Sequence, residues 1–421
     1  MVSGRRKHQQ VGLMFIDLDR FKAINDKLGH EVGDKMLIEA ASRLQGCVRD
    51  EDTVARMGGD EFTVVLQGLD DQDALEAVAV KILAALARPF MLEAGPHYIS
   101  GSVGVTIFPA DAENTVDLLR NADIAMYQAK AAGRNCYQFY SAGMQEEALV
   151  RVELERDLRR AINGGELVLH YQPIVDTGSR DLRGAEAFLR WKHPVRGLLR
   201  PSEFLSVAQD SHLIVSLGEW VIDEVCRQWR TWVDAGHAPI RISINVSNVH
   251  FRDVGIGQCI ACALERHAVP GSMLSLELNE SVMVDLGESP SRVVQELAVL
   301  DLHYSLDDFG TGYASLTALK WLPFDTVKID RGFMPGLLTS VDDQHMVNAI
   351  VLMAHSHNLA VVAEGVETES QLDFLRNIGC DFVQGYLIGS PVSGAEFGHV
   401  PVRHGADKSK PTWLSATSPE C

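Results

Sequence analysis

The chain has 421 residues, which predicts two to three domains, and its 46% hydrophobic content excludes a chain that is disordered throughout. A formal charge of -19, from 57 acidic and 38 basic residues, argues against non-specific binding to a nucleic-acid polymer. Its 7 cysteines are scattered, as free thiols are in the reducing cytoplasm, where we expect the protein to be. Residues 1–10 lack the apolar core of a secretion signal, and no apolar run is long enough to cross a membrane.

The first part of the chain alternates between strand-like and helical patterns. The predicted elements are a strand over 11–16, a helix over 21–44, a β-hairpin that turns at Gly58-Gly59, a strand over 99–108 and a helix over 115–132. This alternation predicts an α/β sandwich with one central sheet, in a domain that spans residues 1–141.

The second part begins with a charged, amphipathic stretch over 144–162 that lacks glycine and proline, which predicts a connecting helix over 142–162. Eight strand-like runs follow, most of them separated by helical stretches, and they predict a (β/α)8 barrel over 163–402. The runs cover 167–175, 182–189, 240–246, 274–278, 303–306, 326–329, 360–363 and 382–383. The polar tail over 403–421 is expected to be disordered.

Most of the later runs end in side chains that can do chemistry. These are Glu186, Asn245, Glu277, Glu280, Asp307, Asp308, Lys328, Glu364 and Gln384. The C-terminal ends of barrel strands meet at one mouth, where so many carboxylates would repel one another unless metal ions neutralised them. A single acid at such a position more often caps the next helix, but capping does not explain the whole set. An oxygen-rich cluster suits Mg²⁺ or Mn²⁺, and two such ions can activate water and hold a phosphodiester.

Eight motifs occur in order between residues 153 and 392: Tyr171-Gln-Pro-Ile, Glu186-Ala-Phe-Leu-Arg-Trp, Asn245-Val-Ser, Glu277-Leu-Asn-Glu280, Asp307-Asp-Phe-Gly-Thr-Gly-Tyr, Lys328-Ile-Asp, Glu364-Gly-Val-Glu367 and Gln384-Gly-Tyr. Together they resemble the EAL family of phosphodiesterases. The resemblance implies a barrel with an altered first strand, two Mg²⁺ or Mn²⁺ ions, a homodimer, and hydrolysis of the bacterial second messenger c-di-GMP to linear pGpG.

The same resemblance implies a role for each motif residue. Lys328 would orient or deprotonate the attacking water, and Glu280 would support the loop over 308–313. The substrate would be held by Gln172, Arg190 and Gln384. The implied metal ligands are Glu186, Asn245, Glu277, Asp307, Asp308 and Glu364, of which Glu364 is also counted as catalytic. Phe188 stands where the family has leucine, on the same strand face as Glu186, and its ring could crowd the mouth slightly.

The first domain also carries motifs, although Gly-Gly-Asp alone would indicate no more than a hairpin turn. They are Asp17-Leu-Asp-Arg-Phe-Lys, Asn25-Asp, Gly29-His, Gly33-Asp34, Arg56-Met-Gly-Gly-Asp-Glu-Phe62 and Ala129-Lys-Ala-Ala-Gly-Arg-Asn135. As a set they resemble the GGDEF diguanylate cyclase family, which makes c-di-GMP from two GTP in a dimer. The implied roles are metal binding by Asp17 and Asp60, metal binding or general-base action by Glu61, guanine contacts by Asn25 and Asp34, phosphate contacts by Lys130 and Arg134, and product inhibition through Arg49 and Asp52.

The GGDEF family usually begins with a helix that carries Asp-x-Leu-Thr-Gly-Leu-x-Asn-Arg, and this chain starts too late to contain it. Loss of a packing helix would expose apolar sheet surface and loosen the domain. We therefore expect a tandem GGDEF–EAL protein that hydrolyses c-di-GMP, with a first domain that binds GTP and has weak or no cyclase activity. The alternative is a receptor in which both domains bind nucleotide without chemistry.

Overall fold

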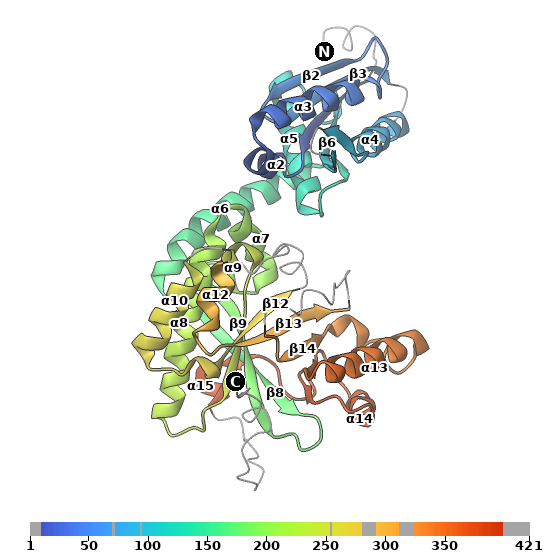
Figure 1. Ribbon diagram of the computed structural model, residues 1–421. Helices are drawn as coiled ribbons and strands as arrows, with labels where there is room; N and C mark the ends of the chain where they lie inside the picture. The colour runs from blue at the N-terminus through green and yellow to red at the C-terminus, as the bar shows by residue number, and fades with distance from the viewer. Residues whose placement is uncertain are drawn as a thin grey trace. The chain divides into compact units, whose positions relative to one another are not determined.

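The computed structural model describes residues 10–69, 72–92, 95–252, 255–279, 292–310 and 323–398. The chain divides into two compact units, Met1–Leu154 and Glu155–Cys421, and the boundary falls within helix α6 (Ala142–Gly164) (Figure 1). The domain limits predicted at 141, 162 and 402 remain predictions, and the tail over 403–421 lies outside the described residues. Within the described ranges, no helix combines the length and the apolar character that a membrane span requires.

The first unit is built on a five-stranded sheet in the order β2-β3-β1-β6-β7. Its strands are β1 (Gln10–Leu18), β2 (Thr53–Gly58), β3 (Glu61–Leu69), β6 (Gly101–Phe108) and β7 (Tyr137–Phe139). Only β6 and β7 pair in parallel. A separate short hairpin joins β4 (Phe90–Leu92) to β5 (Gly95–His97).

The central strand β1 is buried on both faces, which explains its continuous apolar run. Met14, Ile16 and Leu18 face a core formed with α3 (His30–Gln45) and α4 (Gln72–Leu86). Leu13 and Phe15 point the other way, toward α5 (Thr115–Ala131). Successive side chains of a strand alternate between faces, so helices cover both sides of the sheet and the predicted α/β sandwich is confirmed.

The single helix predicted over 21–44 is wrong, because the chain breaks there into α2 (Phe21–Leu28) and α3. Gly29 lies between them with φ +88°, a backbone conformation that glycine adopts without steric cost. The pattern of apolar residues continues across the break, which is why periodicity alone did not reveal it.

The second unit is a closed barrel. Its strand order is β10-β9-β11-β12-β13-β14-β15-β16-β8-β17, and an additional β8–β9 pairing closes the ring. The strands are β8 (Leu167–Asp176), β9 (Leu182–His193), β10 (Gly197–Leu199), β11 (Arg241–Asn245), β12 (Leu274–Asn279), β13 (His303–Phe309), β14 (Thr326–Ile329), β15 (Ala360–Ala363), β16 (Phe382–Val383) and β17 (Val392–Ser393). Strand β8 is antiparallel to β9 and β16, whereas β9 and β11–β16 pair in parallel. The predicted barrel with an altered first strand is confirmed.

Helices surround the strands of this barrel (Figure 1). They are α7 (Pro201–Asp210), α8 (Leu213–Asp234), α9 (Asn248–Phe251), α10 (Ile256–His267), α12 (Arg292–Ala298), α13 (Val341–Ser356), α14 (Glu369–Asn377) and α15 (Gly394–Phe397), with 3-10 turns η1 (Gly271–Met273) and η3 (Arg331–Phe333). Their apolar faces join the strands in one core that includes Ile222 and Trp229 of α8 and Ile242 of β11. This packing fixes where each strand ends, and therefore where the strand-end side chains lie.

Candidate active site

The pairing register of the barrel brings the polar strand ends together. Asn245 of β11 is paired with Glu277 of β12, and Asp307 of β13 is paired with Asn279. One layer below, Ser275 and Ser305 share a hydrogen bond of 3.1 Å between their Oγ atoms. Residues two apart on a strand share a face, so the carboxylates stand above a polar layer inside the mouth.

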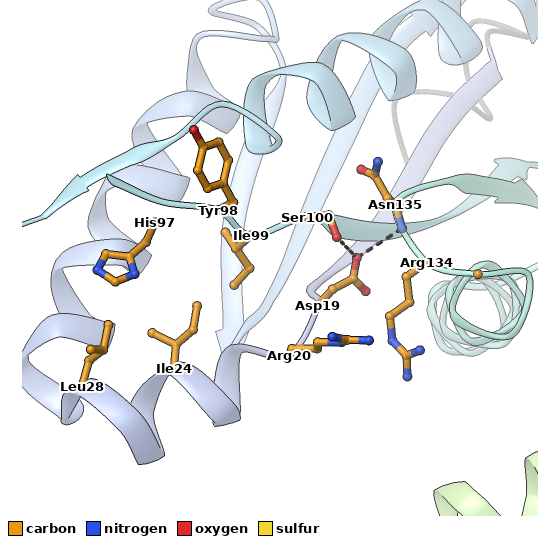
Figure 2. A pocket seen from close by; sticks show the side chains of 11 residues that line it. Asp19, Arg20, Ile24, Leu28, His97, Tyr98, Ile99, Ser100, Arg134 and Asn135 are labelled. Carbon is orange, nitrogen blue, oxygen red and sulfur yellow. Dashed lines mark hydrogen bonds between the residues drawn. The ribbon is translucent and has the colours of Figure 1, made fainter. Parts of the chain in front are cut away.

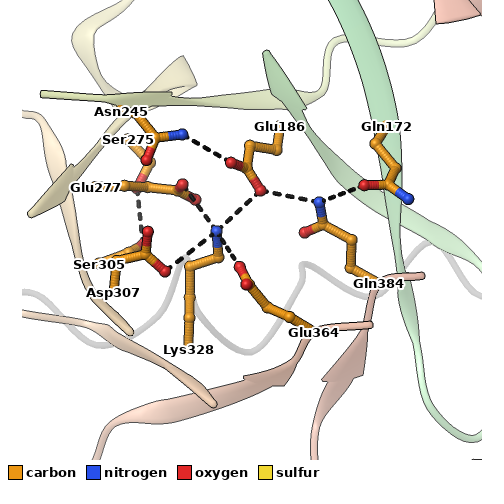
Figure 3. Close-up of polar contacts among 10 residues, drawn as sticks. All are labelled: Gln172, Glu186, Asn245, Ser275, Glu277, Ser305, Asp307, Lys328, Glu364 and Gln384. Atoms are coloured by element: carbon orange, nitrogen blue, oxygen red, sulfur yellow. Dashed lines mark hydrogen bonds and ion pairs between the residues drawn. The ribbon is translucent and has the colours of Figure 1, made fainter. Parts of the chain in front are cut away.

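Lys328 lies at the point where the carboxylates converge, and its side chain is fully buried (Figure 3). Its Nζ lies 2.9 Å from Glu186 Oε2 and 2.8 Å from Glu277 Oε2, at hydrogen-bonding distance. The same atom lies 2.5 Å from Glu364 Oε1 and 3.7 Å from Asp307 Oδ1. One ammonium group therefore touches four acids contributed by four strands or strand ends.

Burial by itself would lower the pKa of Lys328, but the surrounding carboxylates outweigh it and hold that pKa well above its ordinary value. Burial raises the pKa of Glu364 to about 7, against the attraction of Lys328. A single ammonium cannot neutralise four carboxylates, so the cluster has an excess of negative charge. Divalent cations are the usual partners of such an excess.

Glu186 and Glu277 both contact Lys328, yet their pKa values shift in opposite directions. Burial and the neighbouring Glu186 raise the pKa of Glu277. Burial also acts to raise the pKa of Glu186, but Lys328 and hydrogen bonds from Gln384 and Asn245 outweigh it and lower that pKa. The extra donors explain the difference, because hydrogen bonds to a carboxylate favour its charged form.

Two amide side chains fix the orientation of Glu186. Asn245 Nδ2 donates to Glu186 Oε1 at 2.7 Å, and Gln384 Nε2 donates to Glu186 Oε2 at 2.8 Å. Gln384 Nε2 also donates to Gln172 Oε1 at 3.0 Å, and Gln172 Nε2 donates to the carbonyl of Gly389 at 2.9 Å. The sequence placed Gln384 at the mouth, but its contact with Glu186 could not be predicted because the two residues are far apart in the chain.

The oxygen atoms of this cluster fit a hard divalent cation. Glu277 Oε1 and Asp307 Oδ1 are buried and accept no hydrogen bond, so each can still bind a cation. Carboxylate and amide oxygens are the ligands that Mg²⁺ and Mn²⁺ prefer. In the part of the chain that the structure describes, no three acidic, histidine or cysteine side chains already form a metal-binding group. The Lys328 ammonium group lies among these acids and donates to Glu186 Oε2 and Glu277 Oε2.

The remaining predicted residues of the mouth lie at its edge or outside the described residues. Asp308 is exposed as a residue, with φ +53°. Its carboxylate is still partly desolvated, and this desolvation together with the charge of Asp307 raises its pKa. The Arg190 guanidinium lies 5.6 Å from the centre of the Phe188 ring, so that ring supports Arg190. Glu280 falls in 280–291, outside the described residues.

Sequence reasoning did not single out Arg200, which follows the last residue of β10. A signal was available, because two strand-like runs flank Pro194 and a short turn there pairs them as a hairpin. The observed register pairs Leu199 with Trp191, and its continuation by one residue puts Arg200 opposite Arg190.

In the first unit, Asp17 is buried at the end of β1 and forms an ion pair of 2.8 Å with Lys130 Nζ. The Asp60 carbonyl accepts the Leu18 backbone N–H at 3.3 Å, and Glu61 is paired with Asp17 across the sheet. Burial raises the pKa of Asp17. The structure therefore brings together Asp17, Asp60, Glu61 and Lys130 near the Gly-Gly hairpin.

The predicted guanine contacts lie on α2 and α3. Asn25 Oδ1 is buried without a hydrogen bond, and a Cβ on Gly33 would come within 1.9 Å of it. Asp34 is exposed on α3. Gly33 thus leaves space for the Asn25 side chain between the helices.

The predicted inhibitory pair is not a preformed guanidinium–carboxylate pair. Asp52 instead accepts backbone N–H groups, from Arg49 at 3.0 Å and from Gln67 at 3.2 Å. The Arg49 guanidinium lies 3.6 Å from Glu51 and is exposed.

The first unit also contains a cavity of about 490 Å³ (Figure 2). Among the residues predicted to contact GTP, Arg134 is the one that lines it. Arg134 has φ +65° in the turn after α5. Asp19 closes one end of the cavity, accepting hydrogen bonds from Ser100 Oγ at 2.6 Å, Ser102 Oγ at 2.7 Å and the Asn135 N–H at 3.2 Å. The Asp19 carboxylate therefore joins the end of β1 to the start of β6.

Comparison with known families decides the identity of both units. The EAL domain model matches residues 155–391, and the model for the diguanylate cyclase GGDEF domain matches residues 2–136. The chain belongs to the EAL family and is a tandem GGDEF–EAL protein. The order of the two domains agrees with the order of the motifs.

This GGDEF–EAL chain is 43% identical over 387 residues to the bifunctional diguanylate cyclase/cyclic di-GMP phosphodiesterase MucR of Pseudomonas aeruginosa. That match covers 92% of this chain and 56% of MucR. It is 37% identical to the cyclic di-GMP phosphodiesterase PdeR of Escherichia coli, over 93% of this chain and 58% of PdeR. The chain thus spans a little over half the length of these two relatives.

Solved structures agree with the fold. The PaMucR phosphodiesterase in complex with c-di-GMP shares 43% identity and a TM-score of 0.54, and the match covers 58% of this chain and 99% of that one. The Vibrio cholerae LapD S helix-GGDEF-EAL structure has a TM-score of 0.60 at 20% identity, covering 90% of this chain and 89% of that one. At that identity LapD supports the fold alone.

Proposed function

We propose that the EAL domain is a metal-dependent phosphodiesterase that hydrolyses c-di-GMP to linear pGpG. The observation that carries this proposal is the buried cluster of four carboxylates around Lys328 at the barrel mouth. Buried like charges are costly, and their concentration in one mouth is typical of a catalytic site. The names of the relatives MucR and PdeR support the choice of substrate.

The residues that would hold two Mg²⁺ or Mn²⁺ ions share oxygen ligands and a place at the ends of barrel strands. They are Glu186, Asn245, Glu277, Asp307, Asp308 and Glu364. When bound, the ions would supply positive charge to the phosphoryl oxygens and a water of lowered pKa.

Lys328 would act as a hydrogen-bond donor and a fixed positive charge. An ammonium group has three N–H donors and no acceptor, and its carboxylate neighbours stabilise that charged form. It can therefore hold the attacking water, or a phosphoryl oxygen, in a defined orientation. Of the two roles implied by the family, orientation agrees better with these contacts than deprotonation.

Gln384 would act through Glu186 and not on the substrate directly. Its amide holds one Glu186 oxygen and the Gln172 side chain at the same time. Gln172 and Arg190 then remain as the substrate contacts, and Gln384 positions both a metal ligand and a substrate ligand.

We further propose that the GGDEF domain binds GTP through Asp17, Asp60 and Lys130 and has weak or no cyclase activity. Cyclisation requires two loaded domains of a homodimer to align two reacting groups, and misplacement by about 1 Å can cost on the order of 100-fold in rate. Asp34 and Arg134 are both exposed, and within one chain nothing in the described structure aligns two GTP molecules.

A receptor that binds c-di-GMP without cleaving it is the second candidate. It is favoured by one observation: Lys328 Nζ already occupies Glu186 Oε2 and Glu277 Oε2, oxygens that a metal ion would also need. The enzyme remains the stronger proposal, since every predicted ligand that the structure describes carries an oxygen donor at the mouth.

Hydrolysis is tested with purified protein, c-di-GMP and Mg²⁺, with products separated by chromatography. We expect pGpG to accumulate with Mg²⁺ or Mn²⁺ and to be absent in chelator. Calorimetric binding of c-di-GMP without any pGpG would favour the receptor. Equal turnover in chelator would contradict the role of metal.

A further inference from the structure

The hairpin formed by β9 and β10 places a second arginine beside Arg190. The antiparallel register pairs Leu198 with Lys192 and Leu199 with Trp191. Continued by one residue beyond the end of β10, the same register puts Arg200 opposite Arg190. Residues directly opposite each other in an antiparallel pair have side chains on the same face, with Cβ atoms about 5 Å apart. Arg200 continues the extended backbone, with φ -89° and ψ 158°.

That face of the hairpin belongs to the barrel mouth. Glu186, Phe188 and Arg190 are two residues apart along β9 and share one side of the strand. Trp191 and Leu199 point to the opposite side and are buried. Four residues of strand separate Arg190 from Glu186, a distance of about 13 Å, so the two arginines lie beyond the carboxylate cluster.

The charges of the two arginines act on each other. Burial and the neighbouring Arg200 lower the pKa of Arg190, while Tyr386 opposes this shift. Within the described residues, neither guanidinium forms an ion pair with a carboxylate. The Arg190 guanidinium donates to its neighbouring carbonyl, Leu189 O, at 2.8 Å, and it lies over the Phe188 ring.

The Arg200 side chain makes no capping hydrogen bond to the helix that it precedes. Arg200 is the N-cap of α7, where serine, threonine, aspartate and asparagine are preferred and where a positive charge opposes the helix dipole. The Arg200 backbone N–H is satisfied by Glu203 Oε2 at 2.7 Å, through a contact that any residue at position 200 could make. The Arg200 guanidinium is therefore not required for capping α7.

Two adjacent guanidinium groups without a carboxylate partner are suited to a phosphate, because each planar fork donates two hydrogen bonds and the anion removes their mutual repulsion. A cyclic dinucleotide carries two phosphates, and the cluster around Lys328 can accommodate the one that is cleaved. We propose that Arg200 extends the substrate contact of Arg190 into a phosphate subsite, which holds the phosphate that is not cleaved. This inference rests on c-di-GMP being the ligand.

The subsite is tested by calorimetry of c-di-GMP binding in Ca²⁺, comparing the wild type with Arg200→Ala and Arg200→Lys. We expect Arg200→Ala to weaken binding about tenfold and to reduce its dependence on salt. Arg200→Lys should recover part of the affinity, because it restores the charge without the planar fork. The matched control is Arg180→Ala, which removes an exposed arginine, paired with Glu369, that lies just before the start of β9.

A substrate with one phosphodiester separates the two subsites. Hydrolysis of bis(p-nitrophenyl) phosphate should be unchanged by Arg200→Ala, since this compound has no second phosphate. The subsite would be overturned if Arg200→Ala left the c-di-GMP affinity unchanged. It would also be overturned if Arg200→Ala reduced hydrolysis of bis(p-nitrophenyl) phosphate by the same factor as it reduced c-di-GMP affinity. A wild type that binds c-di-GMP and never cleaves it would overturn the proposed hydrolysis while the affinities still test Arg200. A wild type that does not bind c-di-GMP would overturn both.

Discussion

The two domains hold their charged groups in different ways. At the EAL mouth, Lys328 and Glu277 are buried and in direct contact, and amide groups fix Glu186 on both of its oxygens. In the GGDEF domain, Asp17 is buried against Lys130, whereas Asp34 is exposed. The EAL site is assembled from side chains in mutual contact, whereas the GGDEF site includes exposed side chains.

This difference bears on which of the two reactions, hydrolysis or cyclisation, a single chain can catalyse. Preorganised charges stabilise a transition state because they need no reorganisation at the moment of reaction. At the EAL mouth, hydrogen bonds hold Glu186, Glu277 and Lys328 in fixed positions. In the GGDEF domain Asp17 and Lys130 already pair, but cyclisation also requires a second GTP-loaded domain, so we expect hydrolysis to dominate over synthesis.

Replacement of Mg²⁺ by Ca²⁺ should have the largest effect. Ca²⁺ prefers longer and looser coordination than a tight two-metal site allows, so we expect hydrolysis to fall to the rate measured in chelator. Initial rates of pGpG formation in Mg²⁺, Mn²⁺, Ca²⁺ and chelator provide the measurement. Rapid hydrolysis in Ca²⁺ would mean that the oxygen cluster does not select its metal.

Glu186→Ala should lower turnover by about 1,000-fold, because it removes a proposed metal ligand whose contribution is several kcal/mol. We expect the thermal unfolding transition to remain, since the mouth serves chemistry more than stability. Glu369→Ala, at an exposed carboxylate of the same domain, is the control. Loss of the unfolding transition in Glu186→Ala would make Glu186 a structural residue.

Lys328→Ala should reduce kcat by about 100-fold and leave c-di-GMP affinity nearly unchanged, because an orienting donor is needed mainly in the transition state. The variant should also unfold at a lower temperature without metal, since removing one partner of a buried ion pair costs about 3–5 kcal/mol. Added Mg²⁺ should restore part of that loss by neutralising the acids. A large fall in affinity with unchanged kcat would show that Lys328 is a substrate clamp.

GTP should have the smallest effect, changing the rate of c-di-GMP hydrolysis by about fivefold through coupling between the domains. The measurement is a GTP titration during hydrolysis, repeated with Asp60→Ala, which should abolish the response. Hydrolysis that is unchanged at saturating GTP would show that GTP bound to the GGDEF domain does not regulate the EAL domain. Efficient synthesis of c-di-GMP from GTP would contradict the proposed weak cyclase.

Much of the fold could be predicted, because apolar runs mark barrel strands directly. The predicted strands over 326–329 and 360–363 coincide with β14 and β15. Strand β9 extends beyond its predicted end to His193, because its outer part pairs with β10 in a hairpin instead of crossing the core. Polar residues such as Lys192 in that part hid the strand from a pattern based on burial.

The site was predicted in its composition and less well in its contacts. The strand-end acids and Lys328 were found from their positions, since parallel strands bring their ends to one mouth. The amide contacts from Gln384 to Glu186 and Gln172 depend on side-chain geometry between distant strands. No spacing along the sequence reports such contacts.

A single reaction tests the central claim most directly. Purified protein with Mg²⁺ receives isotopically labelled c-di-GMP and unlabelled GTP together, and the products are resolved by mass. We predict that labelled pGpG accumulates and that little or no unlabelled c-di-GMP is formed. Unlabelled c-di-GMP formed at a rate matching hydrolysis, or the absence of labelled pGpG, would contradict the assignment of the EAL site to hydrolysis and the GGDEF site to nucleotide binding.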